Sequence, residues 1–499
     1  MLTTDSSGLY AAYKAKDARF DGRFFIGIST TGIYCRPICR ARRPKAENCA
    51  FFSTAAEAEQ AGYRPCLLCR PELAPGNGVT EAAATLANRA ARMLEADCGS
   101  GGSLKGLAGR LGCTDRHLRR VFAAEYNVSP VQYLGTCRLL LAKNLLTDTD
   151  LSVLDVAMAA GFGSLRRFND LFKKHYKLPP TALRKRMPEE RKQNGHITLA
   201  LGYRPPYRFE EMLRFFSGRA IPGVEVIKDG EYWRTVRLPD AEGNRIYGWL
   251  RVEHRPKKRV LTVTVSETLL PVLPQVLSKV RQLFALYCDP DTIFETLAPM
   301  NAIRPGLCVL GTRLPGSFDA FEMAFRAVLG QQITVKAAGT LAARLVAAYG
   351  TPVQTGIPEL THVFPAPEDI LALKGPIESH FGPLGVIASR AKAIYSLAQA
   401  LKQGEISLDR CANPEEEMKK LTAIPGIGRW TAGYIAMRTM GWPDAFLETD
   451  AAVKKALAPH TAKEMSQMAE AWRPWRSYAT INLWNSLQAE EMKEEQHVL

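Results

Sequence analysis

Four cysteines within a short basic segment constrain the fold of this 499-residue chain more than any other feature of its sequence. They form two closely spaced pairs, with three residues inside the first pair and two inside the second: Cys35, Cys39, Cys66 and Cys69. The other seven of the 11 cysteines are scattered, mostly among apolar neighbours. In a reducing compartment such a cluster predicts a metal site, whereas scattered cysteines are typical of small core residues.

The cluster predicts one bound Zn²⁺, because four thiolates are a ligand set that this ion prefers. A bound ion would also supply folding energy that a module of about 75 residues lacks. Spacing alone favours a closed site that only holds the fold together. Any further role of the site depends on the residues around the cysteines.

Three segments surround the cysteines: Asp21–Phe25, Thr30–Arg42 and Gly62–Cys69. They closely resemble the N-terminal domain of the Ada-type adaptive-response proteins, and the resemblance covers residues 1–75. It implies repair of methyl phosphotriesters in DNA, with Cys35 as the residue that accepts the methyl group, once per chain. It also implies DNA contacts by residues that otherwise are typical of a solvated basic face: Thr31, Arg40, Arg42 and Arg64.

The implied methyl transfer has a physical basis. Zinc keeps its thiolate ligands deprotonated at neutral pH, so the nucleophile needs no general base. Methylation turns one thiolate into a neutral thioether and lowers the net charge of the centre from about −2 to about −1. Repulsion of the DNA phosphates then falls and affinity for DNA rises, which converts the repair event into a binding signal.

Positive charge is concentrated in the first part of the chain. Residues 1–188 hold 28 lysines and arginines against 16 acidic residues, whereas the rest of the chain holds 37 against 34. A basic front half predicts a polyanion as its partner. A charge excess that only improves solubility is the alternative.

Residues 80–187 show a helical pattern throughout, with one unit that recurs after about fifty residues. Each unit is a helix, a turn that contains glycine and a second helix, the order of a helix-turn-helix. After the second turn, Gly161–Gly163, Ser164 is expected to cap a helix. The tandem pair resembles the DNA-binding domain of AraC-type regulators, whose two recognition helices enter successive major grooves. The outward residues of these helices are the expected DNA contacts: Arg116, Arg119, Arg120, Arg166, Arg167, Asn169 and Lys173.

A Pro-Gly-Ile-Gly hairpin stands between two apolar helical patterns at residues 425–428. Its backbone amides, at Gly426 and Gly428, are expected to point outward and to bind a phosphate or a monovalent cation that bridges to one. Similar hairpins occur in many sequence-independent DNA binders. Alone, the motif therefore predicts contact with DNA and no particular chemistry.

An aspartate extends this motif, because Asp450 follows Trp430 by twenty residues. Flanking segments agree with it: Gly202–Tyr207, Leu314–Phe321, Arg326–Gln332 and Trp472–Tyr478. Together, residues 196–490 resemble 3-methyladenine DNA glycosylase II of the AlkA family, in the helix-hairpin-helix glycosylase superfamily. The resemblance implies excision of bases that are alkylated at a ring nitrogen.

Such a base is cationic and leaves readily, so the cost lies in the positive charge that develops on the sugar. An ionised Asp450 would stabilise this charge and activate water. An N-cap of the following helix is an alternative role for Asp450, and the two roles are compatible. Trp430 and Tyr434 are expected to sandwich the flipped base, and Trp484 to line the same pocket. Packing in the core is the alternative for these rings.

Two absences and one departure refine this expectation. Trp430 stands where strand-cutting relatives carry a lysine, so a monofunctional glycosylase that leaves an abasic site is expected. No cysteine follows Cys411, which excludes the iron–sulfur cluster of some relatives. The family's wedge, which fills the gap left by the flipped base, is apolar, whereas this chain has Gln332 there. Weaker binding or an altered base preference is the hypothesis.

We therefore expect a multidomain protein that is mainly α with α+β parts. A small four-cysteine zinc domain (1–78) is followed by an all-α tandem helix-turn-helix domain (80–187). An α+β subdomain (196–288) then precedes an all-α helix-hairpin-helix glycosylase domain (289–499). Turn-rich or charged stretches near 71–78 and 184–195 mark the first two boundaries.

These features together predict DNA alkylation repair that is coupled to transcription control. The expected partners are damaged and promoter double-stranded DNA and RNA polymerase, for a monomer in the bacterial cytoplasm near the nucleoid. No stretch is long and apolar enough for a membrane span. The first rival is a regulator whose glycosylase-like half only binds damaged DNA. The second is a structural zinc protein without methyl transfer.

Overall fold

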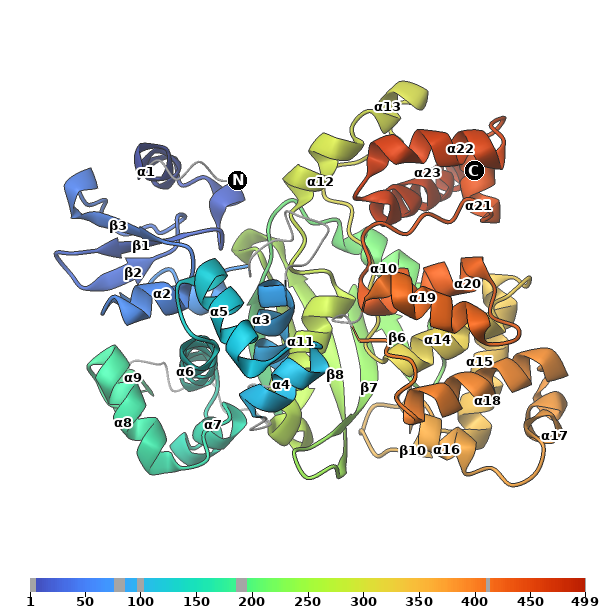
Figure 1. Cartoon of the computed structure of the whole chain (residues 1–499), viewed down its shortest axis with the longest axis horizontal. Coiled ribbons are helices and arrows are strands. Elements are labelled where there is room, and N and C mark those ends of the chain that lie inside the picture. The colour runs from blue at the N-terminus through green and yellow to red at the C-terminus, as the bar shows by residue number, and fades with distance from the viewer. Residues whose placement is uncertain (1–5, 76–85, 97–102, 185–194, 410–412, 499) are drawn as a thin grey trace.

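The structure is a computed structural model in which the modules follow one another from the N-terminal sheet to the C-terminal helices (Figure 1). It describes residues 6–75, 86–96, 103–184, 195–409 and 413–498. The predicted linkers near 71–78 and 184–195 lie partly outside these ranges. Cys98 and Cys411 lie wholly outside them. The protein is mainly helical, and its described residues form three sheets.

The first module is a small sheet with two helices, α1 (Ser6–Ala15) and α2 (Ala55–Gln60). The strand order is β3-β1-β2-β4, and the bounds are β1 Phe25–Ile28, β2 Ile33–Cys35, β3 Cys49–Phe52 and β4 Arg64–Pro65. Strand β4 runs parallel to β2, with Pro65 opposite Tyr34. Cys35 follows Tyr34 and Cys66 follows Pro65, so this pairing brings the two cysteines to the same end of the sheet.

The second module is helical throughout its described residues. Its helices are α3 Leu86–Ala96, α4 Leu104–Arg110, α5 Asp115–Tyr126, α6 Pro130–Asp148, α7 Val153–Ala159, α8 Leu165–Tyr176 and α9 Pro180–Arg184. Thr114 caps α5 and Ser164 caps α8, which confirms the cap predicted at Ser164. Gly112 and Gly161 have φ of 69° and 81° in the turns after α4 and α7, a conformation that suits a residue without Cβ.

The third module is an antiparallel sheet in the order β5-β9-β8-β7-β6. The bounds are β5 His196–Gly202, β6 Glu225–Lys228, β7 Glu231–Pro239, β8 Arg245–Arg255 and β9 Val260–Ser266. Buried and partly exposed residues alternate along β5, as expected for a strand with one buried face. Two helices accompany the strands in this module, α10 (Phe209–Ser217) and α11 (Leu273–Leu283).

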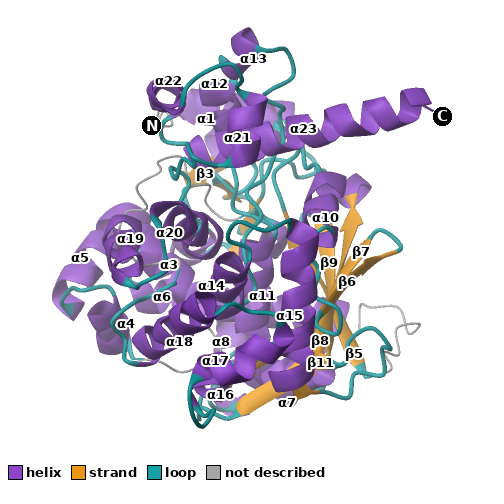
Figure 2. Cartoon of the chain, turned by 90° about the vertical axis from the view of Figure 1, so that its right-hand side faces the viewer, coloured by secondary structure: helices purple, strands orange, loops and turns teal. Residues whose placement is uncertain are grey.

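The fourth module contains the remaining helices and a two-stranded ribbon of β10 (Thr351–Pro352) and β11 (His362–Val363). The helices before the hairpin are α12 Pro290–Leu297, α13 Met300–Ile303, α14 Ala320–Leu329, α15 Val335–Tyr349, α16 Pro367–Leu371, α17 Ile377–Phe381 and α18 Ala388–Lys402. Those of the hairpin and beyond are α19 Pro414–Ala423, α20 Arg429–Ile435, α21 Ala451–Ala456, α22 Ala462–Ala469 and α23 Arg476–Val498. Figure 2 shows the helices gathered to one side of the five-stranded sheet.

The modules are in contact with one another. One apolar core extends from Leu139 of α6 to Leu487 of α23, so the second helix-turn-helix unit shares it with the sheet and the fourth module. Arg70 donates to Asp148 of α6 at 2.8 Å, and Lys143 of α6 pairs with Glu72, which joins the first two modules. No helix in the described part of the chain is both long and apolar enough to cross a lipid bilayer.

Candidate functional site

The four predicted zinc ligands come together at one end of the small sheet. Cys35 ends β2, and Cys66 directly follows β4. The Sγ atoms of the four cysteines all lie within 4.8 Å of one another, and none of them is in a disulfide. A tetrahedral site with Zn–S bonds of about 2.3 Å needs sulfurs about 3.8 Å apart, so the cluster fits the ion. The four cysteines bind one Zn²⁺.

Arg36, the residue after Cys35, makes hydrogen bonds that stabilise the cluster. Its backbone N–H donates to Cys69 Sγ at 3.3 Å, and its guanidinium donates to the backbone oxygen of Cys69 at 3.1 Å. A hydrogen bond and a positive charge near sulfur both favour the thiolate form that a metal ligand needs. Burial lowers the pKa of Arg36, but Asp21, whose Oδ1 accepts from Arg36 Nε at 2.8 Å, more than offsets this and the pKa is raised.

The predicted methyl acceptor lies inside the module and its predicted DNA contacts lie outside. Cys35 is 1% exposed, whereas Cys69 is partly exposed. The predicted contacts are exposed or partly exposed: Thr31, Arg40, Arg42 and Arg64. The predicted acceptor is thus almost fully covered, whereas the predicted contacts are accessible to a partner from solvent.

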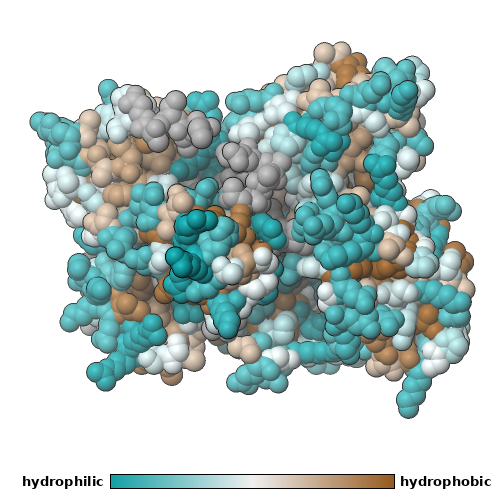
Figure 3. Space-filling view, viewed as in Figure 1, coloured by the Kyte–Doolittle hydropathy of each residue, from teal (hydrophilic) through white to brown (hydrophobic). Residues whose placement is uncertain are grey.

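Both recognition helices, α5 and α8, present their predicted contacts to solvent. Asn169 is partly buried, and the others are exposed: Arg116, Arg119, Arg120, Arg166, Arg167 and Lys173. Hydrophilic side chains gather over α5 in the space-filling view (Figure 3). Arg119 Nε lies 3.1 Å from Asp115 Oδ2, so part of its charge is already neutralised. The helix α6, which connects the two units, has 19 residues and hence a length of about 28 Å.

The hairpin between α19 and α20 has the expected tight turn. Gly426 has φ of 90°, and a Cβ there would lie 3.1 Å from Ala393 Cβ, so two independent reasons favour glycine. Gly428 is the N-cap of α20, and among the described residues no side chain caps the first amides of that helix. Amides at an uncapped helix start suit a phosphate of DNA. No contact in the structure bears on the monovalent cation, which stays a prediction.

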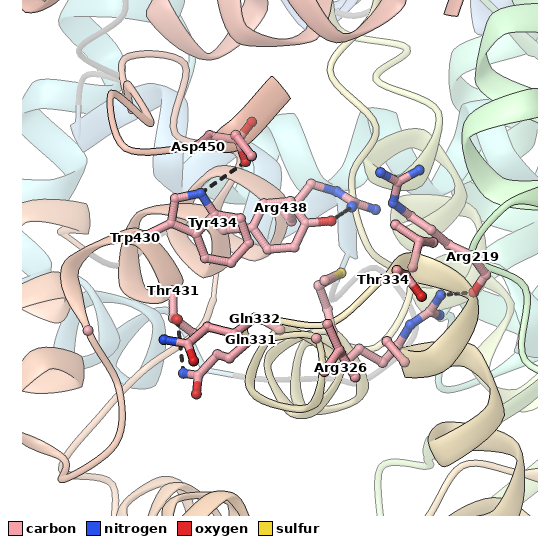
Figure 4. Close-up of a pocket in the computed structure, with 18 of the residues that line it drawn as sticks. Arg219, Arg326, Gln331, Gln332, Thr334, Trp430, Thr431, Tyr434, Arg438 and Asp450 are labelled. Carbon is pink, nitrogen blue, oxygen red and sulfur yellow. Dashed lines mark hydrogen bonds between the residues drawn. The ribbon is translucent and has the colours of Figure 1, made fainter. Parts of the chain in front are cut away.

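Asp450 is held by four N–H donors. Its Oδ1 accepts from the backbone of Ala452 and Val453 and from Trp484 Nε1, each at 3.0 Å. Its Oδ2 accepts from Trp430 Nε1 at 3.1 Å. The N-cap role of Asp450 on α21 is therefore confirmed. The carboxylate also lines a cleft of about 1250 Å³ together with Trp430 (Figure 4) and Trp484.

Trp430 and Tyr434 line the same cleft, but the predicted sandwich is wrong. Their rings stack directly on each other, with centroids 5.3 Å apart and planes at 18°. A base between them would need about 7 Å, which is two van der Waals contacts of about 3.5 Å. Trp484 meets Tyr434 edge-on, with centroids 6.1 Å apart and planes at 60°. A base can therefore stack against this aromatic pair but not between its rings.

Arg438 is a cleft residue that sequence reasoning missed. It is 4% exposed and donates from Nη1 to the Tyr434 hydroxyl at 2.6 Å (Figure 4). Its other N–H groups donate to the backbone oxygens of Pro315 at 2.6 Å and Gly316 at 3.0 Å. The available signal was a single charged residue in the otherwise uncharged and mostly apolar segment 435–440.

Three guanidinium groups set the ionisation of Tyr434. Burial raises the pKa of this phenol, but the charges of Arg438, Arg219 and Arg326 more than offset burial and the pKa is lowered. For Arg438, burial acts in the opposite direction and lowers the pKa of the guanidinium. The inner end of the cleft is therefore electropositive, whereas its mouth carries the carboxylate of Asp450.

Gln332, at the predicted wedge position, lies in the loop between α14 and α15. Its φ is 54°, its side chain is exposed, and it lines the cleft. The loop is tied to the hairpin by Gln331, whose Nε2 donates to the backbone oxygen of Gly426 at 2.8 Å and to Thr431 Oγ1 at 3.0 Å. A left-handed conformation at a residue with a side chain is strained, and such strain clusters at functional sites. The fold thus brings the predicted wedge, hairpin and carboxylate around one cleft.

Four family models match successive parts of the chain. They are the metal binding domain of Ada at residues 8–72 and a helix-turn-helix domain at residues 107–186. The AlkA N-terminal domain matches residues 198–319, and the HhH-GPD superfamily of base excision DNA repair proteins matches residues 325–476. The zinc cluster lies in the first match, and the hairpin and Asp450 lie in the last.

Relatives of known name match the whole chain or large parts of it. A protein of Mycobacterium tuberculosis described as "probable bifunctional transcriptional activator/DNA repair enzyme AlkA" is 37% identical over 493 residues, which is 97% of each chain. The DNA-3-methyladenine glycosylase 2 of Escherichia coli is 35% identical over 57% of this chain and 95% of its own. The bifunctional transcriptional activator/DNA repair enzyme Ada of Escherichia coli is 34% identical over 30% of this chain and 40% of its own.

Proposed function

Because this chain belongs to the family of bifunctional transcriptional activators and DNA repair enzymes of the AlkA type, we propose that it excises alkylated bases from DNA and reports alkylation damage to transcription. The two activities reside in different modules. The helix-hairpin-helix module is the DNA glycosylase, and the zinc and helix-turn-helix modules form the regulator. Double-stranded DNA, damaged or promoter, is the common partner.

The glycosylase acts on bases alkylated at a ring nitrogen, of the 3-methyladenine and 7-methylguanine type. The bond between the base nitrogen and C1′ of the sugar breaks, and its electron pair neutralises the cationic base. Asp450 stabilises the positive charge that develops on the sugar. Water then adds to C1′ and loses a proton to the Asp450 carboxylate, which leaves an abasic site. The base reaches the cleft by leaving the DNA stack, and Gln332 fills the gap.

The observation that carries this proposal is the environment of the Asp450 carboxylate. Two backbone amides and two indoles fix both of its oxygens, and no lysine or arginine forms an ion pair with it among the described residues. Its negative charge is thus oriented but not neutralised by another side chain. Such a carboxylate is suited to stabilise a cation that develops in the cleft.

Monofunctional chemistry is part of the same proposal. A glycosylase that also cuts the strand uses an amine to form a covalent bond with C1′. Trp430 occupies the first turn of α20, and its N–H donates to Asp450. An indole N–H has no basic lone pair to attack C1′, so water is the nucleophile.

The zinc module acts as the sensor. The Cys35 thiolate attacks the methyl carbon of a DNA methyl phosphotriester, a sulfur–carbon bond forms, and the carbon–oxygen bond breaks. Its electron pair leaves with the oxygen, which restores the phosphodiester anion. Zinc supplies electron-rich thiolates at neutral pH when bound. The methylated module binds DNA more tightly, and the recognition helices then bind promoters. The protein acts as a monomer in the bacterial cytoplasm and contacts RNA polymerase.

The experiment that tests the enzyme proposal compares wild type with Asp450→Asn on a duplex that contains 3-methyladenine. Asparagine still caps a helix but carries no charge, so the fold is retained. Wild type is expected to release free 3-methyladenine, and Asp450→Asn to release it roughly a hundredfold more slowly. A wild-type protein that binds this duplex and releases no base would support the rival, a regulator whose second half only binds damage.

A further inference from the structure

A second large cleft lies between the zinc module and the five-stranded sheet. Its volume is about 1450 Å³. One wall is formed by residues around the zinc ligands, namely Ile38, Arg40, Leu68 and Cys69. The other wall is the turn between β8 and β9, which has the sequence Arg-Pro-Lys-Lys-Arg at residues 255–259. The glycosylase half of the chain therefore forms part of the surroundings of the zinc centre.

The two walls are held in place by a direct backbone contact. Strand β5 packs against Pro71–Leu73, the short helix that follows Cys69. At Gly202, the last residue of β5, a Cβ would lie only 1.8 Å from the backbone oxygen of Leu73, so the two backbones touch. Strand β5 pairs with β9, and β9 pairs with β8. The position of the β8–β9 turn relative to the zinc ligands thus follows from the sheet itself.

The cleft is strongly cationic. Seven lysine and arginine side chains line it: Lys16, Arg40, Arg70, Arg255, Lys257, Lys258 and Arg259. The lining carboxylate, Asp148, is already paired with Arg70 at 2.8 Å. Arg255 is paired with Glu253 at 2.8 Å. Lys257 and Lys258 are exposed, and neither has an ion-pair partner among the residues that the structure describes.

The turn that carries these two lysines has a restricted backbone. Pro256 begins a 3₁₀ turn that contains both lysines, and Arg259 ends it with φ of 56°. A fixed proline and a left-handed residue leave the turn few alternative conformations. Leu68, on the opposite wall, is 64% exposed and offers an apolar surface of the kind that packs on a sugar. A polyanion with an apolar component fits between these walls.

We propose that this cleft binds the sugar-phosphate backbone of DNA, so that Lys257 and Lys258 of the glycosylase half hold the strand whose methylated phosphate is offered to the zinc cluster. The inference rests on the proposed sensor function. The zinc centre with four thiolates carries a net charge of about −2 and repels phosphates. Uncompensated cations in the adjoining cleft offset this repulsion. Arg40, an exposed predicted contact of the zinc module, lies in the same cleft and continues the path.

The test compares the full-length, zinc-loaded chain with a Lys257→Ala/Lys258→Ala variant. A Lys374→Ala/Lys402→Ala variant is the matched control, because it loses the same charge from exposed positions of the same half that do not line the cleft. The first readout is the rate of methyl transfer to the protein from a duplex with one methyl phosphotriester. The second is methylation of the protein by methyl iodide, a small neutral donor that needs no DNA site.

The cleft variant is expected to accept methyl groups from DNA about tenfold more slowly than the control at moderate salt, whereas its reaction with methyl iodide is unchanged. Each lost phosphate contact lowers the slope of log affinity against log salt by about 0.9. Binding of the cleft variant to an undamaged duplex is therefore expected to show a slope smaller by about 2 than the control. Release of 3-methyladenine is expected to stay at the wild-type rate.

Equal transfer rates and equal salt slopes in the two variants would overturn the proposal. Slower reaction with methyl iodide would also overturn it, because the substitutions would then act on the zinc cluster and not on DNA. The proposed sensor function fails separately, if wild type takes no methyl group from the phosphotriester duplex. In that case the salt slope on undamaged DNA still decides whether the cleft binds the DNA backbone.

Discussion

Trp430 donates its indole N–H to Oδ2 of Asp450 at 3.1 Å, so a residue expected to bind the base also orients the carboxylate. Trp484 makes the same kind of bond to the other oxygen. The aromatic wall of the cleft and its negative charge are therefore parts of one hydrogen-bonded unit. Changes to the wall are expected to affect chemistry as well as binding.

The Trp430→Phe substitution removes one donor to Asp450 and keeps an aromatic ring. A hydrogen bond to a charged group contributes about 1.5 kcal/mol or more, so single-turnover excision of 3-methyladenine is expected to slow by about tenfold. Trp442→Phe is the control, because Trp442 lies in the same module and does not line the cleft. Excision at the wild-type rate by Trp430→Phe would show that this bond does not position the carboxylate.

Tyr434 is expected to ionise at a lower pH than an ordinary tyrosine, because three arginine charges lower its pKa. Burial raises the pKa of other tyrosines, such as Tyr232, so the first phenolate to form should be that of Tyr434. In spectrophotometric titration, wild type should show one phenolate below pH 10 that Tyr434→Phe lacks. Identical titration curves would contradict the account of the electropositive cleft end.

The same shift predicts a dependence of stability on pH. The folded chain loses the Tyr434 proton at a lower pH than the unfolded chain, so in this window the unfolded state binds more protons. The free energy of unfolding of the module should therefore rise with pH between the lowered pKa and about 10, the ordinary value. Denaturant unfolding of wild type relative to Tyr434→Phe measures this increment, and a relative stability that does not change with pH would contradict it.

The Gln332→Leu substitution restores an apolar wedge. Leucine stacks better against exposed bases than glutamine does, so affinity for a duplex with an abasic analogue is expected to rise several-fold. Gln403→Leu is the control, because Gln403 is exposed and does not line the cleft. Unchanged affinity of Gln332→Leu would show that glutamine at this position does not weaken binding to the abasic duplex. Apolar stacking by the wedge residue would then not determine the affinity.

Removal of zinc should separate the two activities. Wild type is expected to carry one zinc per chain, and Cys66→Ala to lose it together with methyl transfer from DNA. Excision of 3-methyladenine should persist, because the residues of its cleft lie between Arg219 and Gln488. Metal analysis and both assays on the same preparation check this, and loss of excision along with zinc would mean that the zinc module supports the glycosylase fold.

Local patterns predicted the elements of this fold well. The helical pattern over residues 80–187 and the cap expected at Ser164 are both found in the structure. The N-cap at Asp450 was likewise visible in the sequence. These features depend on interactions within a few residues, which periodicity and capping rules describe.

Features that arise from contacts between distant residues escaped prediction. Arg438 is fixed by the carbonyls of Pro315 and Gly316, more than a hundred residues earlier. The stacking of Trp430 on Tyr434 depends on side-chain rotamers, which the sequence does not determine. The cationic cleft joins residues 255–259 to the zinc module, and no local pattern relates the two.

The central claim is that one chain carries both repair chemistries, and one labelling experiment tests it most directly. A duplex treated with a labelled methylating agent carries labelled phosphotriesters and labelled bases together. After incubation with the protein, we predict covalent label on Cys35 that stops at one methyl group per chain, and free labelled 3-methyladenine that continues to accumulate. Label in neither place, or label on a protein in which Cys35 is replaced by alanine, would contradict the account.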